Sequence, residues 1–181
     1  MNRVTLLFMA VLIVLLSACS SAPPKATVPD LQTVSHVDLK RYAGTWYEIA
    51  RYPNSFERGC IAVSATYFPL LNGNISVVNQ CRKERMDGEL ITAEGTLKVV
   101  DRVSNAKLRI SFFWLRSGDY WIIELDKNYG YAVIGNPERS YLWILSRTPH
   151  MKPETYAYLL DRLRDVHQYD VRRLQTVFQP D

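Results

Sequence analysis

The chain changes character at Gly44-Thr45-Trp46-Tyr47-Glu48-Ile49-Ala50-Arg51. From this stretch to about residue 147, short runs rich in Val, Ile, Tyr, Phe and Trp alternate with turn signals such as Asn72-Gly73, Asp87-Gly88 and Ser117-Gly118. Such runs are typical of β-strands, because branched and aromatic side chains pack well on a pleated surface. The pattern predicts eight strands, at approximately residues 44–52, 61–68, 74–81, 90–100, 107–115, 119–126, 130–135 and 141–147.

Eight strands joined by short turns predict an antiparallel meander, whose exposed edges disappear when the sheet closes into a barrel. A barrel of eight strands is just wide enough to hold one small ligand. Because side chains alternate between the two faces of a strand, Leu108, Ile110, Phe112 and Trp114 share one face, which we expect to be buried.

After Pro149 the apolar period becomes that of a helix, which begins at Pro153. Its apolar stripe consists of Tyr156, Leu159, Leu160, Leu163 and Val166, at spacings of three and four. We expect this stripe to pack against the outer wall of the barrel. A last strand at about 173–178 is expected to add to the edge of the sheet.

Three segments resemble the signature motifs of the lipocalins. The first is Gly44-Thr45-Trp46, the second is residues 118–126 (GDYWIIELD) and the third is residues 141–149 (YLWILSRTP). Together they are specific, because they occur in order on the first, sixth and eighth expected strands. From about residue 36 to 179 the chain is similar to the bacterial lipocalin and apolipoprotein D branch. The resemblance implies an all-β fold, an eight-stranded antiparallel up-and-down barrel with a C-terminal α-helix packed outside.

The resemblance also implies a structural base made by Gly44, Trp46 and Arg147. Trp46 would sit at the closed end of the barrel with the Arg147 guanidinium over its ring. A cation–π contact of this kind is worth roughly 0.5 to 2 kcal/mol, and arginine can also bond chain carbonyls there. We therefore expect these residues to hold the fold and not to contact ligand.

The candidate ligand-binding residues lie on other strands. Trp143 and Leu145 share parity with Arg147, so we expect them to line the interior above the base. The same alternation predicts Trp121 and Ile123 on the sixth strand. The family resemblance adds two positions that face the cavity in that branch, Tyr67 and Asn79. Each aromatic side chain has an alternative role as core filling, whereas a buried amide at position 79 needs a hydrogen-bond partner.

The N-terminus predicts an exported lipoprotein. Arg3 precedes an apolar run from Val4 to Leu16, which is too short to span a hydrocarbon core of ~30 Å. The following Ser17-Ala18-Cys19 completes a resemblance to the bacterial lipobox, in which the cysteine is acylated after cleavage. Ser at position 20, in place of Asp, favours the outer membrane in that family's sorting logic. The alternative is an ordinary cleaved signal with an incidental cysteine.

This interpretation divides the chain into three parts. Residues 1–18 are a lipoprotein signal peptide, residues 19–35 are a lipid-anchored tether, and residues 36–181 are the lipocalin domain. The tether contains Pro23, Pro24 and Pro29, which favour an extended chain. We expect the protein on the outer membrane, anchored through acylated Cys19, at its periplasmic face.

The remaining cysteines, Cys60 and Cys81, form an even pair in an exported chain, which favours a disulfide. A two-residue turn at Asn72-Gly73 would offset them by four residues, roughly 13 Å along a strand. Two bridged Cα atoms lie within ~7 Å. The disulfide therefore requires a bulge, a longer loop or a fold-back before residue 61. The alternative is two free, buried thiols.

These observations favour a carrier or store of a hydrophobic ligand, a fatty acid or lysophospholipid. The ligand's anionic head would lie near the rim, where Arg82, Lys83, Arg85 or Arg102 would meet it. Nucleic acid is a poor partner, because the 22 basic and 18 acidic residues are scattered along an exported chain. We expect no cofactor, metal or catalytic residue, since His36, His150 and His167 lie outside the strands and at no metal-ligand spacing. The alternatives are a lipocalin-type enzyme acting on a lipid through a calyx residue, such as a free cysteine, and a structural lipoprotein with a filled barrel.

Overall fold

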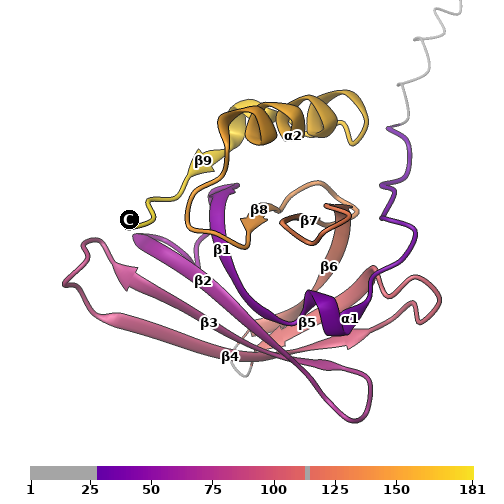
Figure 1. Cartoon of the computed structure of the whole chain (residues 1–181), viewed down its shortest axis with the longest axis horizontal. Helices are drawn as coiled ribbons and strands as arrows, with labels where there is room; N and C mark the ends of the chain where they lie inside the picture. The colour runs from indigo at the N-terminus through magenta and orange to yellow at the C-terminus, as the bar shows by residue number, and fades with distance from the viewer. Residues whose placement is uncertain (1–27, 113–114) are drawn as a thin grey trace, which may run out of the picture.

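Eight antiparallel strands close into a barrel in the computed structural model, which describes residues 28–112 and 115–181 (Figure 1). The strands are β1 (Gly44–Arg51), β2 (Cys60–Pro69), β3 (Ile75–Lys83), β4 (Leu90–Val99), β5 (Lys107–Phe112), β6 (Leu115–Leu125), β7 (Tyr131–Gly135) and β8 (Leu142–Ser146). Each strand pairs with the next in the chain, and β1 pairs with both β8 and β2 to close the barrel. The predicted up-and-down barrel is confirmed.

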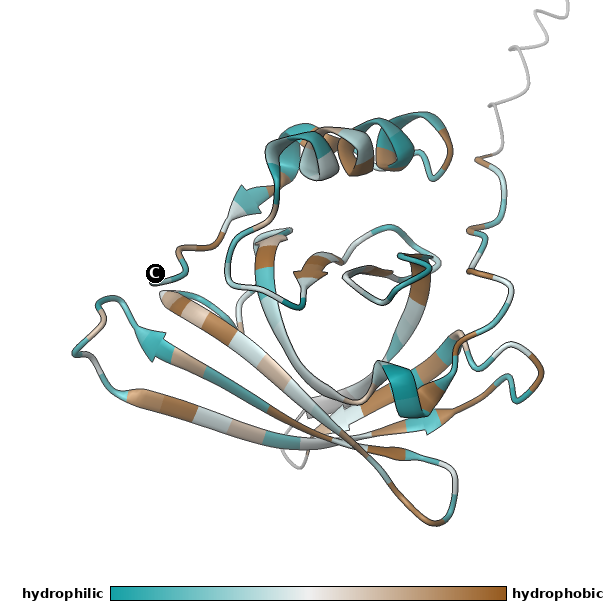
Figure 2. Ribbon diagram, viewed as in Figure 1, coloured by the Kyte–Doolittle hydropathy of each residue, from teal (hydrophilic) through white to brown (hydrophobic). Residues whose placement is uncertain are grey.

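Apolar side chains form two layers, one inside the barrel and one outside β1 and β6–β8. Strand β7 belongs to both, because Ala132 and Ile134 face the interior while Val133 faces outward. The strand therefore has four consecutive buried residues, 132–135, where a half-exposed strand would alternate. Strand β2 differs from β7, because apolar and more polar residues follow one another along it (Figure 2).

The outer layer is covered by helix α2 (Pro153–Asp165), which lies against the outside of the barrel as predicted (Figure 1). Leu159 and Leu163 are fully buried beneath it. Val166 is exposed, contrary to prediction, because the helix ends one residue earlier and leaves Val166 as its C-cap. Within the described part of the chain, none of the helices has the length and apolar character needed to cross a membrane.

The C-terminal segment seals the seam between β1 and β2. The two strands pair only near the base, and strand β9 (Gln175–Thr176) pairs with β1 where they separate. The Val177 amide donates to the Ile49 carbonyl, and the Ala62 amide donates to the Phe178 carbonyl, so the segment bridges both strands. The last strand predicted at 173–178 is thus present, in a shorter form.

The N-terminal segment also packs on the barrel. Leu31 is buried in the outer apolar layer, and the Val34 amide donates to the Ile122 carbonyl. Arg139 Nη2 donates to the Pro29 carbonyl at 2.7 Å. The packed domain therefore begins earlier than the boundary expected at residue 36. The predicted signal peptide (1–18) and Cys19 lie outside the described residues, as does Trp114.

The closed end of the barrel is built as the motifs predict. Trp46 is 0% exposed, and the Arg147 guanidinium carbon lies 3.9 Å from the centroid of its ring. Arg147 donates to the carbonyls of Thr45, Arg41 and Tyr129. Gly44 adopts φ +90°, a conformation that favours glycine, as the chain passes from the short helix α1 (Leu39–Tyr42) into β1.

Cys60 and Cys81 form the predicted disulfide, with their Cα atoms 5.5 Å apart. Two departures from a simple hairpin bring them together. Pro69 pairs with Ile75, so the connection is longer than a two-residue turn at Asn72-Gly73. A bulge between Ile61 and Ser64 then shifts the register again.

Candidate functional site

A cavity of about 480 Å³ opens at the end of the barrel opposite Trp46. Its walls come from the inner faces of β1–β3 and β5–β8, and its mouth from the β1–β2 and β7–β8 connections. This volume lies within the range of ~300–1,000 Å³ that is usual for small-molecule sites. The cavity is the candidate ligand site.

Four of the six predicted ligand-binding residues line this cavity: Tyr67, Asn79, Trp143 and Leu145. Trp143 and Leu145 share the inner face of β8, as their parity with Arg147 indicated. Their contact with a ligand stays a prediction.

The prediction that Trp121 and Ile123 face the interior is wrong. Trp121 lies on the outer face, with the Lys107 ammonium 4.4 Å from its ring centroid. Ile123 packs in the outer apolar layer beneath α2. The sequence suggested a turn at Ser117-Gly118. In the structure β5 ends at Phe112 and β6 starts at Leu115, so Ser117 and Gly118 lie within β6. A strand whose register moves by one residue exchanges its inner and outer faces.

Tyr120 points into the barrel in place of its neighbour Trp121, and the sequence analysis did not identify Tyr120 as a lining residue. It pairs with Leu108, whose inward face had been recognised. Its hydroxyl lies 2.7 Å from that of Tyr42 and 2.9 Å from that of Tyr67, in a buried chain of three hydroxyls. Burial, followed by the neighbouring tyrosines, raises the pKa of Tyr120 well above its usual value. The deep end of the cavity therefore presents neutral hydroxyl groups.

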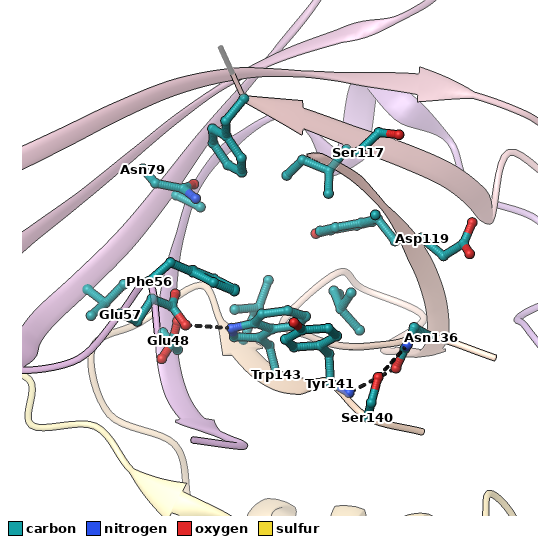
Figure 3. Close-up of a pocket in the computed structure, with 18 of the residues that line it drawn as sticks. Glu48, Phe56, Glu57, Asn79, Ser117, Asp119, Asn136, Ser140, Tyr141 and Trp143 are labelled. Carbon is teal, nitrogen blue, oxygen red and sulfur yellow. Dashed lines mark hydrogen bonds between the residues drawn. The ribbon is translucent and has the colours of Figure 1, made fainter. Parts of the chain in front are cut away.

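Three aromatic rings gather at the mouth (Figure 3). Tyr141 and Trp143 stack with their ring planes 5° apart and their centroids 5.6 Å apart. The Phe56 ring lies 6.0 Å from Tyr141 and 6.3 Å from Trp143. Phe56 is 43% exposed and Tyr141 is 40% exposed, so part of this aromatic surface faces solvent. Phe56 lies in a connection without apolar periodicity, so its position could not be predicted from strand parity.

Two carboxylates lie beside these rings. Glu57 Oε2 accepts a hydrogen bond from Trp143 Nε1 at 3.1 Å (Figure 3). Glu48 is 4% exposed, and its Oε1 lies 2.5 Å from Arg51 Nη1. Burial and then repulsion by Glu57 raise the pKa of the Glu48 carboxyl well above its usual range. One guanidinium thus serves two carboxyl groups, and Glu48 retains its proton more readily than an ordinary glutamate.

Asn79 contributes a shielded acceptor. Its Oδ1 is inaccessible to solvent and has no hydrogen-bond partner among the described residues. A buried carbonyl oxygen without a partner loses the hydrogen bonds that water would supply. The Asn79 residue lines the cavity, but this oxygen atom is not accessible from it.

The basic residues that the sequence placed near a ligand head do not line the cavity. Lys83 Nζ donates to the Arg58 carbonyl, and Arg82 Nη1 donates to the Gly88 carbonyl. Arg85 pairs with Asp87 in the β3–β4 connection. Arg102 lies in the β4–β5 connection, near Gly73 at the closed end of the barrel. None of these side chains is among the residues that line the cavity, and the expectation is wrong for Arg102, which lies at the closed end. Contact of Arg82, Lys83 or Arg85 with a ligand head stays a prediction.

Among the described residues, no group of three or more His, Cys, Asp and Glu side chains is placed to hold a metal ion. Both described cysteines are consumed by the disulfide, so neither offers a thiol to a ligand. The site therefore presents apolar walls, neutral hydroxyls, aromatic rings and carboxyl groups.

Comparisons with known proteins agree with this architecture. The Lipocalin-like domain family matches residues 37–179. The chain is 39% identical over 166 residues to the outer membrane lipoprotein Blc of Escherichia coli K12, covering 92% of this chain and 91% of that protein. It is 37% identical over 133 residues to bovine apolipoprotein D, covering 70% and 69%. Insecticyanin from Manduca sexta has a similar structure, with a TM-score of 0.68, 22% identity and coverage of 86% and 87%. The chain belongs to the lipocalin family.

Proposed function

We propose that this protein binds a fatty acid or lysophospholipid in its barrel and stores or transports it at the outer membrane. The observation that carries the proposal is the cavity of about 480 Å³ with apolar and aromatic walls. Transfer of an acyl chain from water into such a space is favourable by about 0.8 kcal/mol per CH₂ group. A cavity with apolar walls can therefore bind a lipid without any covalent reaction.

The proposed location rests on the relatives and on the N-terminal sequence. Proteins 39% and 40% identical to this chain are named outer membrane lipoproteins. The stretch Leu16-Ser17-Ala18-Cys19 supports the same location and a lipid anchor on Cys19, at the periplasmic face of the outer membrane. A tethered barrel would exchange its ligand close to the membrane surface.

A binding protein is favoured over an enzyme acting through a calyx cysteine. That alternative requires a free, activated thiol. Cys60 and Cys81 are bonded to each other and pack with Val63 and Val177. A structural lipoprotein with a filled barrel is disfavoured by the open cavity.

Analysis of co-purified lipid tests the proposal directly. The whole chain would be purified under mild conditions, extracted with organic solvent, and the extract analysed by mass spectrometry. We expect a single-chain lipid in near-stoichiometric amount. An extract without lipid, together with no change in protein fluorescence on adding any single-chain amphiphile, would favour the structural lipoprotein.

Trp143 provides a second test, because it lines the cavity and its indole is held by Glu57. Titrating delipidated protein with lysophospholipid should change the tryptophan fluorescence, and Trp143→Ala should remove most of that change. Affinity should weaken by about 1 to 3 kcal/mol, the scale of one buried side chain. The matched control is Trp121→Ala on the outer face, which should leave affinity unchanged. Equal effects of the two substitutions would contradict the assignment of the faces.

A further inference from the structure

We infer that a second pocket, outside the barrel, is a binding site for a phosphate group. This outer pocket lies between the N-terminal segment 28–33 and the outer face of the barrel, where Lys107, Trp121, Pro137 and Arg139 line it. Its volume of about 330 Å³ is within the range of ~300–1,000 Å³ that is usual for small-molecule sites. The outer pocket is separate from the barrel cavity, and the inference does not depend on the ligand held in that cavity.

The fold builds the outer pocket by fixing the N-terminal segment against the barrel wall. Arg139 Nη2 donates to the Pro29 carbonyl at 2.7 Å, and Leu31 is buried in the outer apolar layer. The Val34 amide donates to the Ile122 carbonyl at 3.0 Å. Figure 1 shows the segment, in indigo, running along the outside of the barrel toward α1. Contacts within the fold therefore fix both walls of the pocket.

The first support is the positive charge in the pocket. Its cationic lining residues are Lys107 and Arg139, and neither takes part in an ion pair among the described residues. The Arg139 guanidinium donates to two neutral groups, the carbonyls of Pro29 and His167. The Lys107 ammonium lies 4.4 Å from the centroid of the Trp121 ring. Both side chains thus keep a charge that can attract an anion.

Asp101 also lies within electrostatic reach of Lys107, and this carboxylate is already occupied. It accepts hydrogen bonds from the Ser104 hydroxyl and from the Val103 amide. The Lys107 ammonium therefore remains available to a ligand.

The second support is a set of hydrogen-bond donors that lack acceptors. Arg139 Nη1, Lys107 Nζ and Trp121 Nε1 make no hydrogen bond with the described residues, and none of these atoms is shielded from solvent. All three residues line the outer pocket. A phosphate group brings acceptor oxygens, and guanidinium and ammonium groups are well suited to bind it. The donors of the pocket therefore match the acceptors of a phosphate.

Asp30 limits the charge of the ligand. Its carboxylate lines the same pocket and would repel a phosphate, so two positive side chains stand against one negative side chain. The lining therefore carries a net charge of one positive unit, which matches the single negative charge of a phosphodiester. A phosphomonoester carries about −1.5 to −2 at pH 7 and would meet more repulsion from Asp30.

The position of the pocket identifies two sources of such a ligand. Pro29 lines the pocket and lies no more than about 36 Å from the proposed anchor at Cys19, the reach of a fully extended chain. Phospholipid head groups around an acylated Cys19 would supply phosphodiesters at high local concentration. Dissolved phosphodiesters are the other source.

The test follows the Trp121 indole by fluorine NMR in the whole mature protein labelled with fluorotryptophan. Trp121→Phe identifies its resonance. In one arm, glycerophosphoglycerol is added at constant ionic strength to the protein in a detergent without phosphate. In the other arm, the protein is placed in nanodiscs of phosphatidylglycerol or of a neutral glycolipid without phosphate. We expect the dissolved phosphodiester to shift the Trp121 resonance to saturation. Phosphatidylglycerol should shift it in the same direction, and the glycolipid should not.

Two lining variants with opposite expected effects connect the shift to the pocket. Lys107→Gln removes a positive charge and should weaken binding of glycerophosphoglycerol about two- to fivefold, the effect of one partly exposed charge contact. Asp30→Asn removes the repulsion and should strengthen binding by a similar factor. The matched controls are Lys152→Gln and Glu94→Gln, two exposed residues outside the pocket, which change the net charge equally and should leave the affinity unchanged.

A saturating shift in either arm that follows the two lining variants supports the site, and the arm that gives it identifies the source of the phosphate. The inference is overturned if neither glycerophosphoglycerol nor phosphatidylglycerol shifts the Trp121 resonance. It is also overturned if the glycolipid shifts it equally, or if Lys152→Gln and Glu94→Gln act as strongly as the lining variants. Ligand binding inside the barrel is measured separately and is unaffected by each of these outcomes.

Discussion

At the residue scale, Arg147 joins the two ends of the barrel chain at its base. It covers the Trp46 ring at 3.9 Å and bonds carbonyls from α1, from β1 and from the β6–β7 connection. The tryptophan indole donates to the Tyr42 carbonyl at 2.8 Å. Arg147 and Trp46 thus donate hydrogen bonds to backbone carbonyls at the closed end of the barrel. Apolar side chains in their place would leave these carbonyls unpaired.

Trp46→Ala should therefore reduce the free energy of unfolding by about 3 to 5 kcal/mol, the cost of truncating a buried aromatic residue. Arg147→Ala should act in the same direction and less strongly. Urea denaturation measures both effects, and the ligand preference of the remaining folded protein should be unchanged. A Trp46→Ala protein with an unchanged melting temperature and impaired ligand binding would place this residue in the ligand site instead.

Glu48 predicts a pH effect on stability. Its pKa is raised in the folded state above the ordinary value of 4.5, because of burial and then Glu57. Between these two pKa values the folded protein keeps a proton that the unfolded chain has lost, so this carboxyl makes stability fall as pH rises. The groups that face it are Arg51, Glu57 and Tyr67.

Glu48→Gln imitates the protonated form and should remove this contribution. The variant and the native protein should have similar melting temperatures near pH 4.5, and the variant should gain relative to the native protein as pH approaches 7. Taking the difference between the two proteins cancels the other titrating groups. A variant that loses stability progressively toward neutral pH would show that the ionised carboxylate is the form held by Arg51.

At the element scale, the sequence predicts which strands exist better than it predicts which way their side chains point. For Trp46 and Arg147 the family motifs predict the side-chain direction as well as the strand, because the two side chains contact each other at the closed end of the barrel. On β6 alternation alone was expected to place Trp121 inside the barrel, whereas the observed register pairs the inward-facing Leu108 with Tyr120. The bulge that moves the register between Ile61 and Ser64 likewise has no marker that the strand pattern could reveal.

The mouth of the site escaped prediction for a related reason. Phe56 and Glu57 lie in a connection, where neither the strand nor the helix period constrains side-chain direction. Their positions follow from hydrogen bonds, since Asn54 Oδ1 accepts from the Glu57 amide and Glu57 accepts from Trp143. The contact between Glu57 and Trp143 joins residues far apart in the chain, and a single sequence does not show it.

The C-terminal segment yields a prediction about the β1–β2 seam. The Gln179 amide donates to the carbonyls of Glu48 and Val63, both at 2.8 Å, and the residue is buried. Gln179→Ala leaves two carbonyls without a donor and should reduce stability by about 1 to 3 kcal/mol. The matched control is Gln175→Ala, an exposed residue of the same segment, which should have little effect in the same urea titration. Equal losses for the two variants would mean that the seam is held by the backbone pairing of β9 alone.

At the scale of the whole molecule, charge is distributed unevenly between surface and cavity. The chain carries a formal net charge of +4 at pH 7, yet the charged side chains that line the cavity are all carboxylates. The basic surplus therefore lies elsewhere on the protein, where it favours approach to anionic head groups. The surface and the cavity thus differ in composition, because the excess of lysine and arginine lies outside the cavity.

The packed N-terminal segment limits how far the barrel can lie from an anchor on Cys19. Leu31 is buried and the Pro29 carbonyl is bonded to Arg139, so the chain is fixed to the barrel from about residue 29. A fully extended chain spans at most ~3.6 Å per residue, so Pro29 lies no more than about 36 Å from Cys19. Two or more acyl chains on that cysteine would hold the protein stably at the membrane.

The anchor can be tested by the mass and location of the mature protein. We expect the wild type to fractionate with membranes, to begin at Cys19 and to carry a thioether-linked diacylglyceryl group. Cys19→Ala should lose that group, whereas Ser20→Ala should keep it, which controls for a change next to the cleavage site. Membrane fractionation alone is insufficient, because an uncleaved apolar segment would also be retained, so the intact mass decides. A mature wild-type chain without the lipid adduct, or a Cys19→Ala chain that still carries it, would show that the lipobox resemblance misled the assignment.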